Sequence, residues 1–232
     1  MGMAVARTLA QRGCRIIFTY RNSKKAAEES VRQLLVTGGQ AAALQCDLTR
    51  GDQIERTAKQ IVQIYKSLDI LVNLSSIYEA SPLSNRKSAD QAWDAHMKAN
   101  AYGAFALSSA VAPWMARSGG GRIIHISDWT SASGRPRYKD YTPYYVSKAA
   151  IKAVVESLAL ELAPKILVNA IAPGPILPPP DLSAREYKNV VTSTPLARWG
   201  GAAEIAKAVL FLVETDFVTG ETIRVDGGRH LN

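Results

Sequence analysis

The chain has little cysteine and little histidine, with two cysteines and three histidines among 232 residues. Cys14 and Cys46 each lie at the edge of an apolar run, and neither belongs to a CxxC pair or a metal-ligand spacing. This excludes a disulfide framework and a zinc motif, and it predicts reduced, buried thiols. We therefore expect a protein of a reducing compartment, the cytoplasm, with no bound metal.

Long hydrophobic runs are absent as well. Arg7, Gln11 and Arg12 interrupt the apolar residues near the N-terminus, and no later run approaches the length of a membrane span. Low-complexity tracts and internal repeats are also lacking, while hydrophobic residues make up 47% of the chain and charged residues 21%. This composition excludes a disordered chain and predicts one globular domain, residues 1–232, that is not bound to a membrane.

Acidic residues are outnumbered, since 28 lysines and arginines face 20 aspartates and glutamates, for a formal net charge of +8. A basic chain suits a polyanionic partner, but the basic residues are scattered and match no nucleic-acid-binding motif. We therefore expect no nucleic acid partner, and a basic surface that tolerates a phosphorylated cofactor.

Apolar, strand-like runs alternate with amphipathic segments along the chain. Strands are predicted at 14–20, 41–48, 68–74, 121–127, 166–172 and 221–228, and helices at 23–35, 51–66, 88–116, 143–163 and 201–214. Continuous apolar strands that alternate with helices indicate an α/β fold, a doubly wound, Rossmann-like parallel sheet covered on both faces. Ligands of such sheets bind beyond the C-terminal ends of the strands.

The beginning departs from this pattern. Residues 2–13 read as a helix that stops at Gly13, and no strand precedes it. The first strand of a nucleotide-binding half is therefore expected to be absent from the chain.

Several segments occur in the order typical of one enzyme family. They are the YxxxK motif Tyr144 to Lys148, LVNLSS at 71–76, Asp47-Leu48, Asn100 within a predicted helix, NAIAPGPI at 169–176 and FVTGETIRVDGG at 217–228. Together they resemble the classical short-chain dehydrogenases/reductases over the whole chain. The resemblance implies a nicotinamide-dependent oxidoreductase, usually a homotetramer or homodimer.

The family's glycine-rich loop between its first strand and first helix is represented only by Gly2. That loop presents backbone N–H groups to the cofactor pyrophosphate at a helix N-terminus. Either the start of the sequence lies about ten to fifteen residues downstream of the true one, as strand and loop lengths require, or the chain is a truncated member. We favour the misplaced start.

Tyr144 and Lys148 lie four residues apart, so they share one face of a helix. A nearby ammonium group lowers the pKa of a phenol, which makes it a better acid. The resemblance assigns Tyr144 as the proton donor, Lys148 as its partner and ribose ligand, and Asn100 as the support of a water beside Lys148. Without the other segments, a tyrosine and a lysine at this spacing are more often surface and packing residues.

Asp128 stands where the family usually has a catalytic serine. An aspartate at this position resembles pteridine reductases and dihydromonapterin reductases, in which it acts with the tyrosine on a pterin ring. The C-terminal GGRHLN resembles the end of the latter enzymes. The alternative is that Asp128 caps a turn and that Ser127, Thr130 or Ser131 fills the serine position.

Cofactor preference is indicated after the first predicted strand, where no carboxylate is present to bind a ribose 2′-hydroxyl. Arg21, Asn22 and Ser23 are suited to a 2′-phosphate instead, which favours NADPH. The alternative is that Ser23 only caps the next helix and Arg21 is a surface charge. By resemblance, further cofactor contacts are assigned to Asp47, Leu48, Asn73, Ser75, Lys148, Pro173, Gly174 and Ile176.

The substrate side of the site is less defined. Tyr78 is the aromatic residue nearest to the position that stacks a pterin in pteridine reductases, although Ile77 holds that position itself. Arg135, Arg137, Tyr138 and Tyr141 either line the substrate entrance or form a solvated basic loop, and residues 177–187 are predicted to act as a lid. His230 either reaches a site across an oligomer interface or is exposed.

These observations predict an NADPH-dependent reductase of the short-chain family, acting on the C=N bond of a pterin or dihydropterin through Tyr144, Asp128 and Tyr78. The alternative in the same class is a carbonyl reductase of the 3-oxoacyl or small-ketone type. The alternative in another class is a truncated, non-catalytic member that serves as an interaction protein.

Overall fold

Parallel strands with helices on both faces make up the structure, a computed structural model that describes residues 1–232. The strands are β1 (Ile16–Tyr20), β2 (Ala41–Gln45), β3 (Ile70–Asn73), β4 (Gly121–Ile126), β5 (Ile166–Pro173) and β6 (Thr222–Val225). The α-helices are α1 (Gly2–Ala10), α2 (Lys24–Val36), α3 (Gly51–Tyr65), α4 (Arg86–His96), α5 (Gly103–Arg117), α6 (Trp129–Ala132), α7 (Thr142–Leu162), α8 (Ala184–Thr192) and α9 (Ala202–Glu214).

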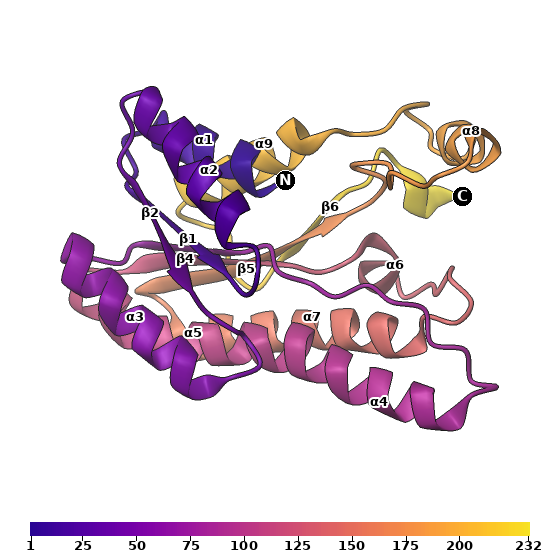
Figure 1. Ribbon diagram of the computed structural model, residues 1–232, viewed down its shortest axis with the longest axis horizontal. Helices are drawn as coiled ribbons and strands as arrows, with labels where there is room; N and C mark the ends of the chain where they lie inside the picture. Colours follow the sequence, from indigo (N-terminus) through magenta and orange to yellow (C-terminus); the bar gives the residue numbers. More distant parts are fainter.

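The layers follow from the apolar character of the strands. Helices α1, α2 and α9 cover one face of the strands, and α3, α4, α5 and α7 lie on the other (Figure 1). Every residue of β5 from Ile166 to Ala172 is buried, as a strand covered on both faces requires. The predicted doubly wound α/β architecture is confirmed.

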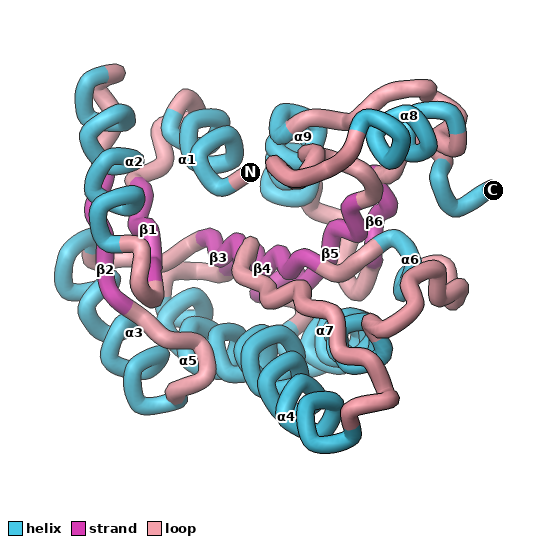
Figure 2. The backbone as a smooth tube through the Cα atoms, turned by 45° about the vertical axis from the view of Figure 1, so that its right-hand side comes forward, coloured by secondary structure: helices cyan, strands magenta, loops and turns pink.

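The sheet is interrupted between β1 and β3. Strand β1 pairs only with β2, and β3 belongs to a second sheet of order β3-β4-β5-β6, an arrangement that Figure 2 shows from the side. The facing edges of β1 and β3 therefore have no ladder partner. This interruption lies where the sequence predicts an absent strand, and the proposed truncation itself stays a prediction.

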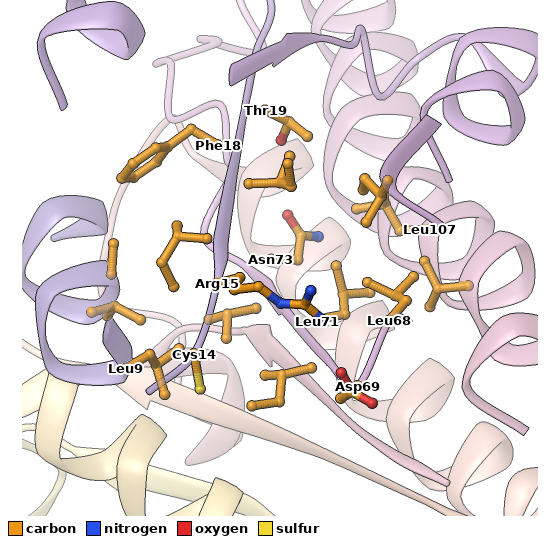
Figure 3. Close-up of a pocket in the computed structure, with 18 of the residues that line it drawn as sticks. Leu9, Cys14, Arg15, Phe18, Thr19, Leu68, Asp69, Leu71, Asn73 and Leu107 are labelled. Carbon is orange, nitrogen blue, oxygen red and sulfur yellow. The ribbon is translucent and has the colours of Figure 1, made fainter. Parts of the chain in front are cut away.

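An apolar cavity of about 580 Å³ lies between these two edges. Leu9 of α1 lies on one side of it and Leu68 and Leu107 on the other, with Arg15 and Asp69 as charged neighbours (Figure 3). Two buried clusters of side chains enclose the rest of the sheet, one against α1 and α9 and one against α5 and α7. Residues of β1 and β3 border the cavity, whereas none of β2 does.

The prediction of one continuous α-helix at 88–116 is wrong. A π-helical turn, η1 (Met97–Tyr102), separates α4 from α5. Within it, Asn100 turns its amide toward the backbone of Ile77, and such widened turns occur frequently at functional sites. A short helix missed by the sequence analysis, α8, follows residues 177–183 and begins with a capping box between Ser183 and Glu186.

The two cysteines are free, Cys46 buried and Cys14 only partly buried. None of the helices combines the length and the apolar character that a membrane crossing requires.

Candidate active site

The N-terminal part of α7 carries the two residues of the YxxxK motif. Pro143 lies in the first turn, where its fixed φ and missing N–H suit a helix start. Tyr144 and Lys148 are both buried, with exposed fractions of 7% and 1%, and both lie near the C-terminal end of β4. The structure therefore places the predicted pair at the edge of the sheet where ligands of this fold bind.

Asp128 follows β4 and contacts Tyr144 directly. The Tyr144 hydroxyl donates a hydrogen bond of 3.0 Å to Oδ2 of Asp128. The other oxygen, Oδ1, accepts 2.8 Å and 2.5 Å hydrogen bonds from the backbone N–H and hydroxyl of Thr130. Asp128 therefore caps α6 and hydrogen-bonds Tyr144 at the same time, so the cap expected in one alternative is present together with the contact to Tyr144 expected in the other.

The neighbouring hydroxyl groups point elsewhere. Ser127 donates to the carbonyl oxygen of Lys148, and Ser131 donates to the carbonyl oxygen of Asp128. The hydroxyl of Thr130 donates to the carboxylate of Asp128. No serine or threonine of this segment hydrogen-bonds Tyr144, so Asp128 is the polar partner of the phenol.

The sequence analysis expects a nearby Lys148 to lower the pKa of Tyr144, but in the structure the net effect of its surroundings is to raise this pKa. Burial raises the pKa of Tyr144 far above its ordinary value, and the carboxylate of Asp128 raises it further. The ammonium group of Lys148 donates a hydrogen bond of 2.8 Å to the carbonyl oxygen of Ile126. Its Nζ lies 5.9 Å from the centre of the Tyr144 ring. Tyr144 is consequently held as the neutral phenol, the form that donates a proton.

Lys148 is itself perturbed. Burial lowers the pKa of its ammonium group to about 8, and the negative charge of Asp128 acts in the opposite direction. A lysine with this pKa is mostly protonated at neutral pH and loses its charge in mildly alkaline solution.

Asn100 holds the segment that follows β3. Its Oδ1 accepts a hydrogen bond of 3.0 Å from Ile77 N–H, and its Nδ2 donates to Ile77 O and to the hydroxyl of Ser147. The structure thus gives Asn100 a direct role in fixing the backbone next to Tyr78. The water relay that the family resemblance implies for it stays a prediction.

Three tyrosines gather around the Tyr144 phenol, and together the four form a tyrosine cluster, comprising Tyr78, Tyr138, Tyr141 and Tyr144. The ring of Tyr78 stacks on Tyr141 at 4.5 Å and meets Tyr144 edge-on at 4.7 Å. Burial and the neighbouring phenols raise the pKa of Tyr78, so it stays neutral. The loop alternative that places Tyr138 and Tyr141 at the substrate entrance is the one that agrees with this geometry.

The residues predicted to read a 2′-phosphate lie together between β1 and α2. Arg21, Asn22 and Ser23 are all exposed, and Arg21 has no carboxylate within ion-pair distance. Ser23 is the N-cap residue of α2, but its hydroxyl makes no capping hydrogen bond. The interpretation of Ser23 as a simple cap is therefore not supported, and its hydroxyl is available to a phosphate at this helix N-terminus.

Asp47 and Leu48 follow β2. The Asp47 carboxylate accepts hydrogen bonds from the N–H and hydroxyl of Thr49, and this backbone N–H, with a smaller contribution from Arg21, lowers the pKa of Asp47. Leu48 and Gly2 line the cavity between β1 and β3. Their assignment to the cofactor stays a prediction.

Asn73, at the end of β3, is buried and lies beside the cavity. Its Oδ1 accepts from the Ser75 N–H at 3.2 Å, and its Nδ2 lies 3.4 Å from Nδ1 of His125. His125 in turn contacts the hydroxyl of Ser108 at 2.8 Å. Burial lowers the pKa of His125 to about 4, so a neutral imidazole orients Asn73.

His125 was missed by the sequence analysis. The only signal for it was a polar residue in the middle of the apolar run at 121–127.

The Pro-Gly loop follows β5. Gly174 donates its N–H to Val225 O, and an added Cβ would lie 2.5 Å from Cβ of Asp226, so only glycine fits here. Pro173 is the last residue of β5. Ile176 is buried while its N–H is engaged by no acceptor of the chain, which agrees with the predicted contact to a carboxamide.

His230 is not exposed, contrary to one of the two expectations. Its Nδ1 lies 2.8 Å from Oδ2 of Asp226, and its backbone N–H donates to the same oxygen. This anchors the C-terminal segment, including the 3₁₀ turn η2 (Arg229–Leu231), next to α6.

Comparisons with known proteins indicate the family to which the chain belongs. A family model described as enoyl-(acyl carrier protein) reductase matches residues 1–230. The 3-oxoacyl-[acyl-carrier-protein] reductase FabG of Staphylococcus aureus is 34% identical over 236 aligned positions, which cover 100% of this chain and 94% of the relative. A 3-oxoacyl-[acyl-carrier-protein] reductase of Synechocystis sp. is 32% identical and covers 98% of this chain and 92% of the relative.

The fold is also similar to that of a solved oxidoreductase structure. The gluconate 5-dehydrogenase of Burkholderia cenocepacia, in complex with NADP and tartrate, has a TM-score of 0.89 at 29% identity and covers 100% of this chain and 91% of that one. None of these relatives carries the name of a pteridine reductase, so the finer resemblance predicted from Asp128 is not supported. The family match over nearly the whole chain, together with the buried Tyr144 and Lys148, shows that the protein belongs to the short-chain dehydrogenase/reductase family of oxidoreductases.

Proposed function

We propose that the protein is an NADPH-dependent reductase of a ketone carbonyl, of the 3-oxoacyl or small-ketone type. The observation that carries this proposal is the buried, neutral Tyr144 hydroxyl at the C-terminal edge of β4, with Lys148 one helical turn away. Reductases of 3-oxoacyl thioesters are among its relatives at 34% identity over the full chain. The pterin reaction, preferred from the sequence alone, becomes the second candidate.

NADPH fits the residues that are present at both ends of its proposed site. Arg21 and Ser23 offer a charge and a free hydroxyl to the 2′-phosphate, and no carboxylate lies within ion-pair distance of Arg21. At the other end, Lys148 is hydrogen-bonded to the last residue of β4, and the Ile176 N–H, which has no acceptor in the chain, follows the end of the neighbouring strand β5. NADP is also present in the solved gluconate 5-dehydrogenase. NADPH supplies the hydride to the carbonyl carbon when it is bound.

The chain's own residues then manage the proton. Tyr144 transfers its hydroxyl proton to the carbonyl oxygen, which must replace Asp128 as the acceptor of the phenol hydrogen bond. The resulting phenolate is unfavourable next to Asp128 and is stabilised by the positive charge of Lys148. The tyrosine cluster covers this centre and limits its contact with water.

The Asp128–Tyr144 hydrogen bond favours the second candidate, a pterin. A carboxylate accepts the ring N–H groups of a pterin, which a serine hydroxyl does less well. The exposed ring of Tyr78, already stacked on Tyr141, can lie against a flat heterocycle.

A substrate panel and an Asp128→Ser variant separate these candidates. The native protein is assayed with NADPH against acetoacetyl thioesters, small ketones and dihydropterins. The proposal expects ketone turnover that survives in D128S, because serine still provides a hydroxyl beside Tyr144. Dihydropterin turnover that disappears in D128S, without ketone turnover, would overturn it in favour of the pterin.

The pH dependence of reduction is a further prediction. The pKa of Lys148 is lowered to about 8, so its stabilising charge is present below this pH and is lost as the pH rises through it. We expect kcat for ketone reduction to fall above about pH 8. A Lys148→Arg variant keeps its charge over this range, so its pH profile should be flat there, even if its rate is lower. A fall at the same pH in K148R would contradict the assignment to Lys148.

Assembly and location stay predictions, a homotetramer or homodimer in the cytoplasm. The non-catalytic alternative is tested by the same panel, since an interaction protein would turn over none of its substrates.

A further inference from the structure

A buried histidine that has no part in the proposed proton transfer lies next to the reactive phenol. His96, the last residue of α4, is fully buried, and its ring meets that of Tyr144 edge-on, with 6.2 Å between the ring centres. Helix α4 packs against α7, which brings the two rings together (Figure 1). A buried polar side chain costs free energy unless its polar atoms are hydrogen-bonded, so the partners of this imidazole indicate its role.

Both ring nitrogens of His96 have a backbone partner, and these partners fix where its proton lies. Nδ1 lies 2.7 Å from the carbonyl oxygen of Ala92, and Nε2 lies 3.4 Å from the backbone nitrogen of Glu79. A carbonyl oxygen only accepts a hydrogen bond, and a backbone N–H only donates one. His96 is therefore the neutral Nδ1–H tautomer, in which Nδ1 donates to Ala92 O and Nε2 accepts from the Glu79 N–H.

The backbone is held on both sides of Tyr78 by this part of the chain. Asn100 hydrogen-bonds both the N–H and the carbonyl oxygen of Ile77, and His96 accepts from the N–H of Glu79. His96 and Asn100 lie four residues apart along α4 and η1, so both reach the same segment. Two neighbouring side chains thus fix the residue before Tyr78 and the residue after it.

Tyr78, the residue between these two contacts, lies beside the reactive phenol. Its ring meets that of Tyr144 edge-on at 4.7 Å and stacks on Tyr141 at 4.5 Å. The N–H of Ser81 donates to Asp140 O at 2.6 Å, which ties the segment that carries Tyr78 to the loop that carries Tyr141. Tyr78 keeps an exposed fraction of 52%, so a substrate whose carbonyl group lies at Tyr144 has this ring as its neighbour.

We propose that His96 is a positioning residue that holds the Glu79 amide as its neutral Nδ1–H tautomer and thereby keeps the ring of Tyr78 in place as a side wall of the substrate site. This rests on the proposed carbonyl reduction at Tyr144. A wall of this kind contacts the substrate equally before and during the reaction, so its displacement weakens substrate binding without slowing the chemical step.

The tautomer is measured first, without turnover, by NMR of protein labelled with ¹⁵N in its histidines. The chain has only three histidines, and ¹⁵N chemical shifts separate protonated from unprotonated ring nitrogens. At neutral pH we expect one imidazole that is protonated on Nδ1 alone, with signals that are absent in His96→Gln, which assigns them to His96. An Nε2–H tautomer or a doubly protonated ring at His96 would overturn the proposal.

Two variants separate the acceptor atom of His96 from the rest of its ring. Glutamine at this position places an amide oxygen about where Nε2 lies, whereas asparagine reaches only to the place of Nδ1. We expect hydrogen exchange of the Glu79 amide to be about tenfold faster in His96→Asn and near the native rate in H96Q. The Ile77 amide, held by Asn100, should exchange at the native rate in both. Equal exchange of the Glu79 amide in H96N and the native protein would contradict the proposed contact.

Steady-state kinetics with NADPH and a ketone measure the consequence for the substrate. In H96N we expect the KM for the ketone to rise about tenfold, with kcat and the KM for NADPH changed by less than about twofold. H96Q should restore the native KM. Asp94→Asn, which changes an exposed residue of the same helix, is the control and should behave as the native protein does.

A double variant tests whether His96 acts through Tyr78. Tyr78→Ala should raise the KM for the ketone as well, and H96N combined with Y78A should be no worse than Y78A alone, because the ring that His96 positions is then missing. Additive losses, or a kcat that falls in H96N while KM stays native, would overturn the role of His96. If no ketone is reduced while the tautomer and the Glu79 exchange are as expected, the proposed function fails and the contact of His96 to this segment stands.

Discussion

Replacing Tyr144 with phenylalanine is expected to lower kcat for reduction by about 10²- to 10⁴-fold, the usual contribution of a positioned general acid. The hydroxyl is the only group of this side chain that can donate a proton, and the ring packing is retained. Steady-state kinetics with NADPH and a ketone substrate measure the effect. The affinity for NADPH should change little, because the variant removes no charge.

Tyr145→Phe is the matched control, since this neighbour is also a tyrosine of α7 but is only partly buried, and it is Tyr144 whose hydroxyl donates to Asp128. It should keep nearly full activity. Similar losses in both variants would show that α7 as a whole was disturbed. An unchanged kcat in Y144F would exclude Tyr144 as the proton donor.

Replacing Arg21 with glutamine is expected to weaken NADPH binding by about 10- to 150-fold and to leave NADH binding unchanged. The reason is the loss of a charged hydrogen bond to the 2′-phosphate, worth about 1.5–3 kcal/mol. NADH lacks this phosphate, so it has nothing to lose. Fluorescence titration of the variant with each nucleotide measures the two affinities.

Lys25→Gln serves as the control for Arg21. Lys25 is an exposed cation of the same segment but follows the N-cap of α2 by two residues. Its replacement should weaken NADPH binding far less, mainly by lowering the local positive potential. An equal loss of NADPH and NADH affinity in R21Q would indicate that Arg21 supports the fold of this segment rather than the phosphate.

Much of the fold could be predicted because the local signals agree with one another. The apolar runs at 121–127 and 166–172 do not alternate with polar residues, as half-exposed strands do. They therefore predict a sheet that is buried on both faces. The single helix predicted at 88–116 failed because periodicity does not detect a π-helical turn. Within that turn, Asn100 hydrogen-bonds the Ile77 backbone, which is a tertiary contact that no local pattern indicates.

The candidate site divides in the same way. Tyr144 and Lys148 were predictable because their spacing on a helix sets their common face. The effect of their surroundings was not, since the pKa of Tyr144 depends on burial and on Asp128, a residue 16 positions away. The roles of His125 and Ser108 could not be predicted either, because their buried hydrogen bond joins residues that only folding brings together.

By itself, therefore, the sequence determined the doubly wound class, the order of the elements and the residue types available for proton transfer and phosphate binding, because these depend on local periodicity and spacing. Only the tertiary structure decided that Asp128 both caps a turn and hydrogen-bonds Tyr144, that β1 and β3 remain apart, and that His125 contacts Asn73 and Ser108. Those features join residues distant in the chain, and their energies depend on burial and on distances that no local pattern encodes.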